Sequence, residues 1–164
     1  MRELVFVDTE STGLADNPDA EIVELTWCKL HTEPTTLYFG VQEVPEFIDN
    51  LIGFSKRGIA GRYSTYGEFD EFLHDSDGAT MVAANPSHDM HFIQQAGLWR
   101  FHYRMLDIES YAFAKLPHKF DDVPGMQSIY DTLKAMGADI TEPDHTSRND
   151  VLAMRDAFIY METM

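Results

Sequence analysis

Short apolar runs separated by polar turns predict a series of β-strands along the chain. Residues 3–8, ELVFVD, combine apolar and β-branched types and end on an acid, which is typical of a buried strand leading into a functional edge. Residues 21–30 and 35–42 follow, separated by a polar turn containing Pro34, so the first three strands are expected to form an antiparallel meander. Further strands are expected at 80–84 and 103–108.

Later segments carry the spacing of amphipathic helices. In EFDEFLHD, residues 68–75, the three large apolar side chains fall on one helical face. Residues 147–162 place four large apolar side chains, from Val151 to Met161, in one stripe that is expected to face a core. Further helices are expected at 87–97 and 125–137.

The order of these elements predicts the fold class. Three strands precede an alternation of helices and strands, and an α/β fold with a mixed five-stranded sheet flanked by helices satisfies that order, with ligands near the strand ends. No repeat, low-complexity block or linker divides the sequence, so residues 1–164 are expected to form one domain. A hydrophobic content of 44% excludes a disordered chain.

Composition adds a compartment and a restriction on partners. Cys28 is the single cysteine, lies among apolar residues and cannot form an internal disulfide, so we expect it to pack as a small hydrophobe. Neither a secretory signal nor an apolar run of about 18 residues is present, which favours a cytoplasmic protein without a membrane partner. The net charge of -16 argues against loose, non-specific coating of nucleic acid.

Two acids follow the first predicted strand, in Asp8-Thr9-Glu10. If the strand continues, side chains two apart project from the same face, so the two carboxylates converge. Like charges so close repel unless a cation compensates them, and Mg²⁺ or Mn²⁺ prefers such oxygen ligands. Alternatively, Asp8 and Thr9 satisfy backbone donors in a turn before Gly13.

Two later segments place acids at comparable positions. Asp89 comes soon after the strand at 80–84, near the expected start of a helix. His145 precedes the last helix, and Asp150 lies in its first turns. Each acid could simply complement a helix dipole, but three segments of this kind in this order are less easily explained separately.

These motifs resemble the DEDDh family of 3′-to-5′ exonucleases, which includes proofreading exonucleases and oligoribonuclease. VDTESTGL at 7–14, VAANPSHD at 82–89 and HTSRND at 145–150 are similar to the family's three motifs. MLDIESYAFAKLP at 105–117 resembles the segment where an Asp-centred strand leads into a helix. The resemblance covers nearly the whole chain and implies a ribonuclease H-like fold.

The resemblance also implies a set of site residues and an activity. Two divalent cations, Mg²⁺ or Mn²⁺, would be held by the four acids, and His145 would activate the attacking water, with activity rising from mildly acidic to alkaline pH. The terminal nucleotide would meet Thr12 and Leu14, with Asn85 near the sugar-phosphate chain. The implied reaction removes nucleoside 5′-monophosphates from the 3′ end of single-stranded DNA or RNA. The metal ligands and catalytic acids implied are Asp8, Glu10, Asp89 and Asp150.

The sequence departs from the family pattern at His88, where an aromatic or apolar residue is usual, and over 53–66, which matches only loosely. In that stretch Lys56, Arg57 and Arg62 are candidate phosphate contacts, although they could equally be solubilising charges on an acidic surface. Substrate choice therefore stays open between DNA and RNA. A polymerase or a second copy of the chain is a candidate partner, and free-standing trimming is equally open.

Two other functions remain as alternatives. One is a catalytically silent member of the fold that acts as an interaction module. The other is a metal-dependent hydrolase of a small phosphorylated compound, which the negative charge disfavours less than it disfavours a long polyanion.

Overall fold

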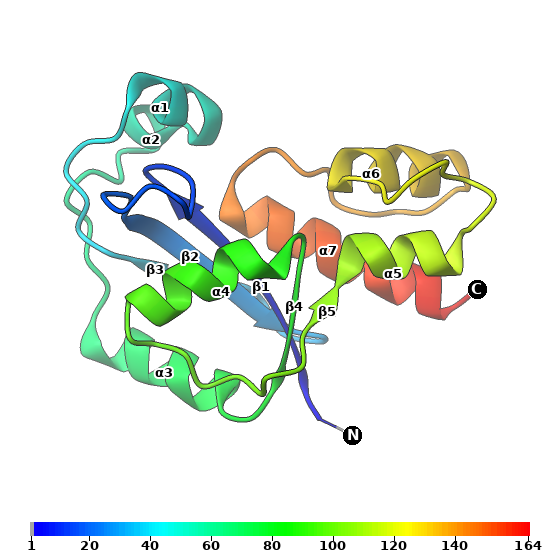
Figure 1. Cartoon of the computed structure of the whole chain (residues 1–164), viewed down its shortest axis with the longest axis horizontal. Coiled ribbons are helices and arrows are strands. Elements are labelled where there is room, and N and C mark those ends of the chain that lie inside the picture. Colours follow the sequence, from blue (N-terminus) through cyan, green and yellow to red (C-terminus); the bar gives the residue numbers. More distant parts are fainter. Residues whose placement is uncertain (1) are drawn as a thin grey trace.

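A mixed sheet forms the centre of the computed structural model, which describes residues 2–164 and within that range contains five strands in the order β3-β2-β1-β4-β5. The strands are β1 (Leu4–Ser11), β2 (Ile22–Lys29), β3 (Thr35–Tyr38), β4 (Thr80–Ala83) and β5 (Leu106–Asp107). β1, β2 and β3 pair antiparallel, whereas β4 and β5 extend the sheet in parallel (Figure 1). The predicted α/β class, with a meander followed by alternating helices and strands, is confirmed.

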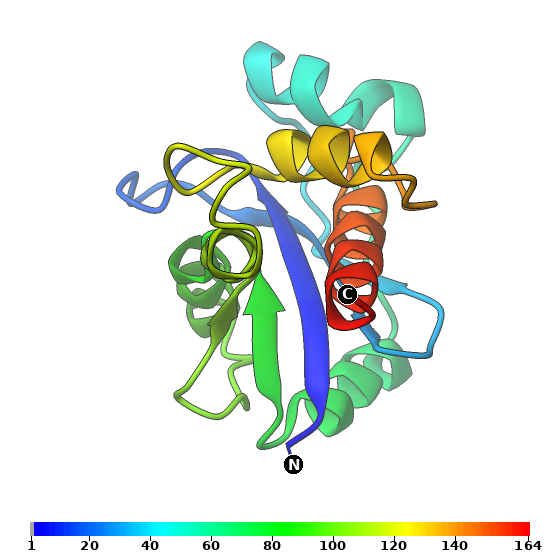
Figure 2. The same ribbon diagram turned by 90° about the vertical axis from the view of Figure 1, so that its right-hand side faces the viewer.

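Helices cover both faces of this sheet. They are α1 (Glu46–Ile52), α2 (Phe54–Arg57), α3 (Tyr66–Ser76), α4 (Pro86–Gln95), α5 (Ile108–Lys115), α6 (Met126–Ala135) and α7 (Ser147–Glu162). Figure 2 shows α7 alongside β1, with α6 packed over it. None of the helices in residues 2–164 has the length and apolarity that a bilayer crossing requires.

Side-chain alternation along β1 assigns its residues to the two cores. Val5 and Val7 are fully buried in the core that also contains residues of α3 and α4. Phe6 points the other way, into the core formed with α5, α6 and α7. Because this period of two continues, Asp8 and Glu10 share the face of Phe6, and Thr9 shares the face of Val7.

Two helices were not expected from the sequence. α1 and α2 form an arm over residues 46–57, which packs through Ile48, Ile52 and Phe54 on a small separate core with Val23. Gly53, at a φ of 68°, ends α1 in the left-handed conformation that glycine adopts without strain.

Two predicted strands are shorter than expected. The strand predicted at 35–42 ends at Tyr38, because Gly40 turns the chain at a φ of 77°. The strand predicted at 103–108 is reduced to Leu106–Asp107, and Tyr103 and Arg104 before it are exposed. The predicted helices at 68–75, 87–97, 125–137 and 147–162 correspond to α3, α4, α6 and α7.

Candidate metal centre

Three carboxylates from the two ends of the chain meet beside β1. Asp8 and Glu10 reach toward α7 from alternate positions of the strand, and Asp150 comes from the first turn of α7. One carboxylate oxygen of each side chain lies within 4.8 Å of the others, and all three residues are half-buried. This spacing can accommodate a divalent cation between oxygen ligands.

Local backbone features aim these side chains. The register between β1 and β2 shifts between Glu10 and Ser11, and such a bulge bends a strand near its end. At α7, the backbone N–H of Asp144 donates to Asp150 Oδ1 over 3.0 Å. The strand and the turn before the helix thus hold their carboxylates in fixed directions.

The second oxygen of Asp8 has no protein partner. Among the described residues, Asp8 Oδ2 is the one buried side-chain nitrogen or oxygen atom without a hydrogen bond. Burial, and then repulsion from Glu10, Asp89 and Asp150, raises the pKa of Asp8 well above its ordinary value. A cation at this position would supply both the missing partner and the missing positive charge.

Glu10 shares this electrostatic environment. Burial raises its pKa from 4.5 to about 9, and repulsion from Glu24, Asp150 and Asp89 adds to the shift, whereas Arg57 opposes it. Without a bound cation, Glu10 therefore holds its proton at neutral pH. A cation would release that proton, so cation binding and proton release are coupled at this centre.

Asp89 stands next to the three-carboxylate group rather than within it. Its Oδ1 accepts two hydrogen bonds from Thr9, one from the backbone N–H and one from the hydroxyl, each 2.9 Å long. Burial raises the pKa of Asp89 to about 7, against the lowering effect of both bonds. Asp89 is separated from the other three acids because side chains alternate along β1. Thr9, which binds Asp89, faces α4, whereas its neighbours Asp8 and Glu10 face α7.

His145 lies at the rim of the centre, in the turn before α7. It is exposed and has a φ of 60°, a left-handed conformation that costs a non-glycine residue about 1 kcal/mol. Asp144 Oδ1 holds the turn by accepting from the N–H and hydroxyl of Thr146. Burial raises the pKa of Asp150, and the backbone hydrogen bond from Asp144 and the charge of a protonated His145 act against this shift.

The expected substrate-contacting residues Thr12, Leu14 and Asn85 lie outside the carboxylate group. Thr12 closes a turn with Glu21 through two 2.9 Å hydrogen bonds and lines an open cavity of about 680 Å³. Leu14 is 69% exposed, a large fraction for an apolar side chain. Asn85 is exposed directly before α4, at a φ of 52°.

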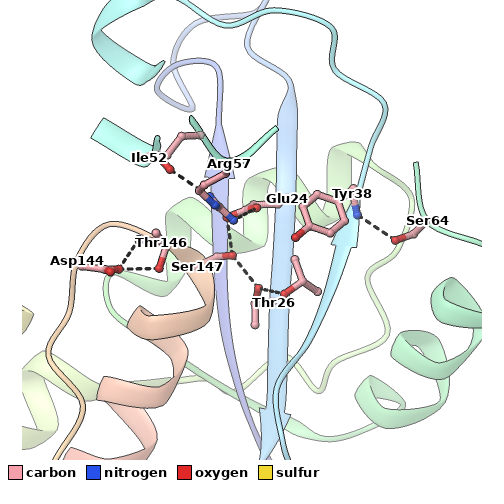
Figure 3. Close-up of polar contacts among 10 residues, drawn as sticks. Glu24, Thr26, Tyr38, Ile52, Arg57, Ser64, Asp144, Thr146 and Ser147 are labelled. Carbon is pink, nitrogen blue, oxygen red and sulfur yellow. Dashed lines mark hydrogen bonds and ion pairs between the residues drawn. The ribbon is translucent and has the colours of Figure 1, made fainter. Parts of the chain in front are cut away.

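The sequence did not predict that Glu24 pairs with Arg57, which was expected to be a candidate phosphate contact. Arg57 is not a free phosphate contact, because its guanidinium grips the Glu24 carboxylate with bonds of 3.0 and 2.7 Å (Figure 3). Glu24 itself is fully buried on β2. The available signal was an acid within the apolar segment at 21–30, because a buried acid needs a partner.

Arg62, another candidate phosphate contact, packs on an aromatic ring, and aromatic residues elsewhere in the chain differ in exposure. Arg62 lies over the ring of Tyr38, 4.2 Å from its centroid, and Phe101 belongs to the core. Tyr63 and Tyr66 are exposed, at 69% and 85%. Cys28 is buried, as expected, and burial raises the pKa of its thiol to about 11.

Comparison with solved structures relates this architecture to known nucleases. The chain superposes on the nuclease domain of 3′hExo, a DEDDh family member bound to rAMP, with a TM-score of 0.64 and 18% identity over 99% of this chain and 92% of that one. The chain has the fold of a DEDDh nuclease domain. It also resembles Brucella melitensis NrnC with bound Mg²⁺, with a TM-score of 0.53 and 13% identity over 99% of this chain and 73% of that one.

A further solved structure, the apo form of a nuclease, gives a TM-score of 0.51 and 13% identity over 98% of this chain and 70% of that one. No family model and no curated protein matches the sequence. At these identities the comparisons define the fold alone, so the chemistry must be argued from the side chains.

Proposed function

We propose that the protein is a metal-dependent 3′-to-5′ exonuclease that removes nucleoside 5′-monophosphates from single-stranded DNA or RNA. The observation that carries the proposal is the unpartnered Asp8 Oδ2, which lies in a group of acids whose ligand atoms are within 4.8 Å of one another. The nuclease fold supports it independently.

The donor set fits a hard divalent cation, because it consists of carboxylate oxygens without cysteine or histidine. Asp8, Glu10 and Asp150 would hold Mg²⁺ or Mn²⁺, and Asp89 would contribute through its oxygen not held by Thr9 or through water. When bound, two dications would stabilise the charge that develops on the attacking and leaving oxygens of the phosphodiester. NrnC, solved with Mg²⁺, supports the choice of metal.

The chain's own residues would position the substrate and move the proton. His145, exposed beside Asp150, would take a proton from the attacking water through its neutral imidazole, so activity should rise from mildly acidic to alkaline pH. Leu14 would pack against the terminal base, Thr12 would meet the same nucleotide, and Asn85 would face the sugar-phosphate chain. The exposed apolar surface of Leu14 suits stacking on an unpaired base.

Charge and compartment refine the proposal. With a net charge of -16, the protein would engage nucleic acid at the metal centre rather than along an extended basic surface, which favours short contacts with chain ends. The buried, free Cys28 is compatible with the reducing cytoplasm. A polymerase and a second copy of the chain remain candidate partners.

The decisive experiment uses 5′-labelled single-stranded DNA, single-stranded RNA and a short duplex, each incubated with Mg²⁺, Mn²⁺ or chelator. We expect a metal-dependent ladder of labelled products that shortens from the 3′ end. Asp8→Asn should abolish it, and Glu71→Gln, an exposed acid on α3, is the matched control. Immediate release of a labelled mononucleotide would reverse the direction proposed.

Absence of any cleavage would refute the proposal. In that case the same preparation should be tested on small phosphate monoesters and diesters. The negative charge of the protein makes such compounds the next class to consider, since they carry less charge than a polynucleotide.

A further inference from the structure

A fifth carboxylate lies beside the metal centre but is fully committed to other groups. Glu24 is 0% exposed and pairs directly with Glu10 across the antiparallel strands β1 and β2. Like charges at such a position repel each other. Both Glu24 oxygens are nevertheless occupied, because Arg57 donates to each, and the Ser147 hydroxyl donates to Oε1 over 2.8 Å.

The hydrogen bonds around Ser147 form a chain in which each hydroxyl donates to the next group. Since the one hydroxyl hydrogen of Ser147 goes to Glu24, Thr26 must donate to Ser147 over 2.7 Å, and Thr36 must in turn donate to Thr26 over 2.7 Å. Figure 3 shows Thr26 on β2 linked to Ser147, the first residue of α7, and Thr36 extends this chain to β3. The network is satisfied at each of these steps, which favours one arrangement of the three elements.

Arg57 connects the same point to the arm. Besides its two bonds to Glu24, its guanidinium donates to the carbonyl oxygen of Ile52 at the end of α1 over 3.1 Å. Glu24 therefore joins the arm, β2 and the start of α7, the helix that carries Asp150 and follows His145. It also lies opposite the strand residue that is expected to bind metal, Glu10.

We propose that Glu24 and Arg57 are positioning residues of the metal centre. The pair fixes the start of α7 against β2, and Arg57 cancels the charge of Glu24, so a dication enters the set formed by the four predicted acids and not a set that includes Glu24. This inference rests on the proposed function. If the ion pair only stabilised the fold, removing either partner would lower stability but would not change metal affinity in opposite directions. Opposite changes in metal affinity therefore provide the test.

The test measures Mn²⁺ binding by isothermal titration calorimetry at pH 8, with no substrate present. A unit charge added or removed about 6 Å from a dication changes cation affinity by about tenfold at the dielectric constant of bulk water, about 80, so tenfold is a lower bound for a partly buried pair. Glu24→Gln leaves Arg57 uncompensated and should weaken Mn²⁺ binding by at least that factor. Arg57→Met leaves Glu24 uncompensated and should strengthen binding by a similar factor.

The double variant Glu24→Gln with Arg57→Met removes both charges. It should return Mn²⁺ affinity to within about twofold of the wild type. If a single variant fails to fold, the double variant still tests the positioning role, because losing the whole pair is less destabilising than a lone buried charge, and the double variant should turn over more slowly at saturating Mn²⁺. Lys56→Met, an exposed position on the same helix, is the matched charge control and should leave Mn²⁺ affinity within about twofold.

Turnover provides the second measurement, made at saturating Mn²⁺ on a single-stranded oligonucleotide. Arg57→Met should bind Mn²⁺ more tightly and still turn over more slowly, because the start of α7 has lost a fixed support. Equal Mn²⁺ affinity in the wild type and in each folded single variant, or wild-type turnover in the double variant, would overturn the inference. A wild type that neither binds Mn²⁺ nor cleaves any oligonucleotide would instead overturn the proposed function.

Discussion

Replacing Glu10 by glutamine should stabilise the metal-free protein. Burial, together with repulsion from Glu24, Asp150 and Asp89, raises the pKa of Glu10 from 4.5 to about 9. A carboxyl group with a raised pKa contributes stability fully below its ordinary pKa, and that contribution is lost as the pH rises toward the folded-state value. In the metal-free wild type, this residue therefore lowers the free energy of unfolding progressively as the pH rises from about 4.5 to about 9.

The size of the effect follows from the same shift. At about 1.4 kcal/mol per pH unit, Glu10 costs the metal-free protein about 5 kcal/mol at pH 8. A buried glutamine amide carries its own desolvation cost of about 1–3 kcal/mol. Glu10→Gln should therefore raise the free energy of unfolding by about 2–4 kcal/mol at pH 8, which raises Tm by at least about 4 °C for a domain of this size.

The assay is thermal unfolding followed by circular dichroism, in chelator, for the wild type and Glu10→Gln from pH 4 to 9. Near pH 4 the variant should be no more stable than the wild type, because only the desolvation cost of the amide remains, and its Tm should rise above that of the wild type toward pH 9. Adding Mn²⁺ should stabilise the wild type far more than the variant, because the variant has lost a ligand. Glu71→Gln controls for a general effect of charge. A variant that is no more stable than the wild type at pH 8 would refute this electrostatic reasoning.

Three further predictions concern single side chains. Thr9→Val removes one of two hydrogen bonds to Asp89 and should lower the free energy of unfolding at pH 8 by about 1.5–3 kcal/mol in urea titrations, whereas Thr9→Ser should not. His145→Ala should keep Mn²⁺ binding but reduce kcat by at least about 100-fold, and wild-type rates would remove this histidine from the mechanism. Cys28, whose pKa burial raises to about 11, should react with a thiol reagent at pH 8 only after unfolding, and rapid reaction of the native protein would contradict its burial.

Local periodicity was sufficient for the elements whose two faces differ in polarity. It placed α7 and the start of β1, and it predicted that Asp8 and Glu10 share one face if the strand continues past residue 8, as it does to Ser11. The arm formed by α1 and α2 was not predicted because its helices are short. Helix α1 has seven residues and α2 has four, and segments this short contain too few turns for the helical period to be recognised.

The contacts around Glu24 could not be predicted from local pattern. Its partner Arg57 is 33 residues away and reaches it only because the arm folds back over β2. Ser147 is 123 residues away. Asp89 illustrates the same limit, since its place in helix α4 was expected but its bonds to Thr9, which hold it apart from the other three acids, depend on tertiary packing.

The position of α7 against β1 has a consequence for how the protein acquires activity. Asp8 and Asp150 are 142 positions apart in the sequence, and their carboxylates come together only when α7 docks on β1, a step that must overcome the entropy of closing a long loop. A partly folded or nascent chain therefore cannot assemble the centre. If the centre cleaves nucleic acid as proposed, that activity would begin only once α7 has docked on β1.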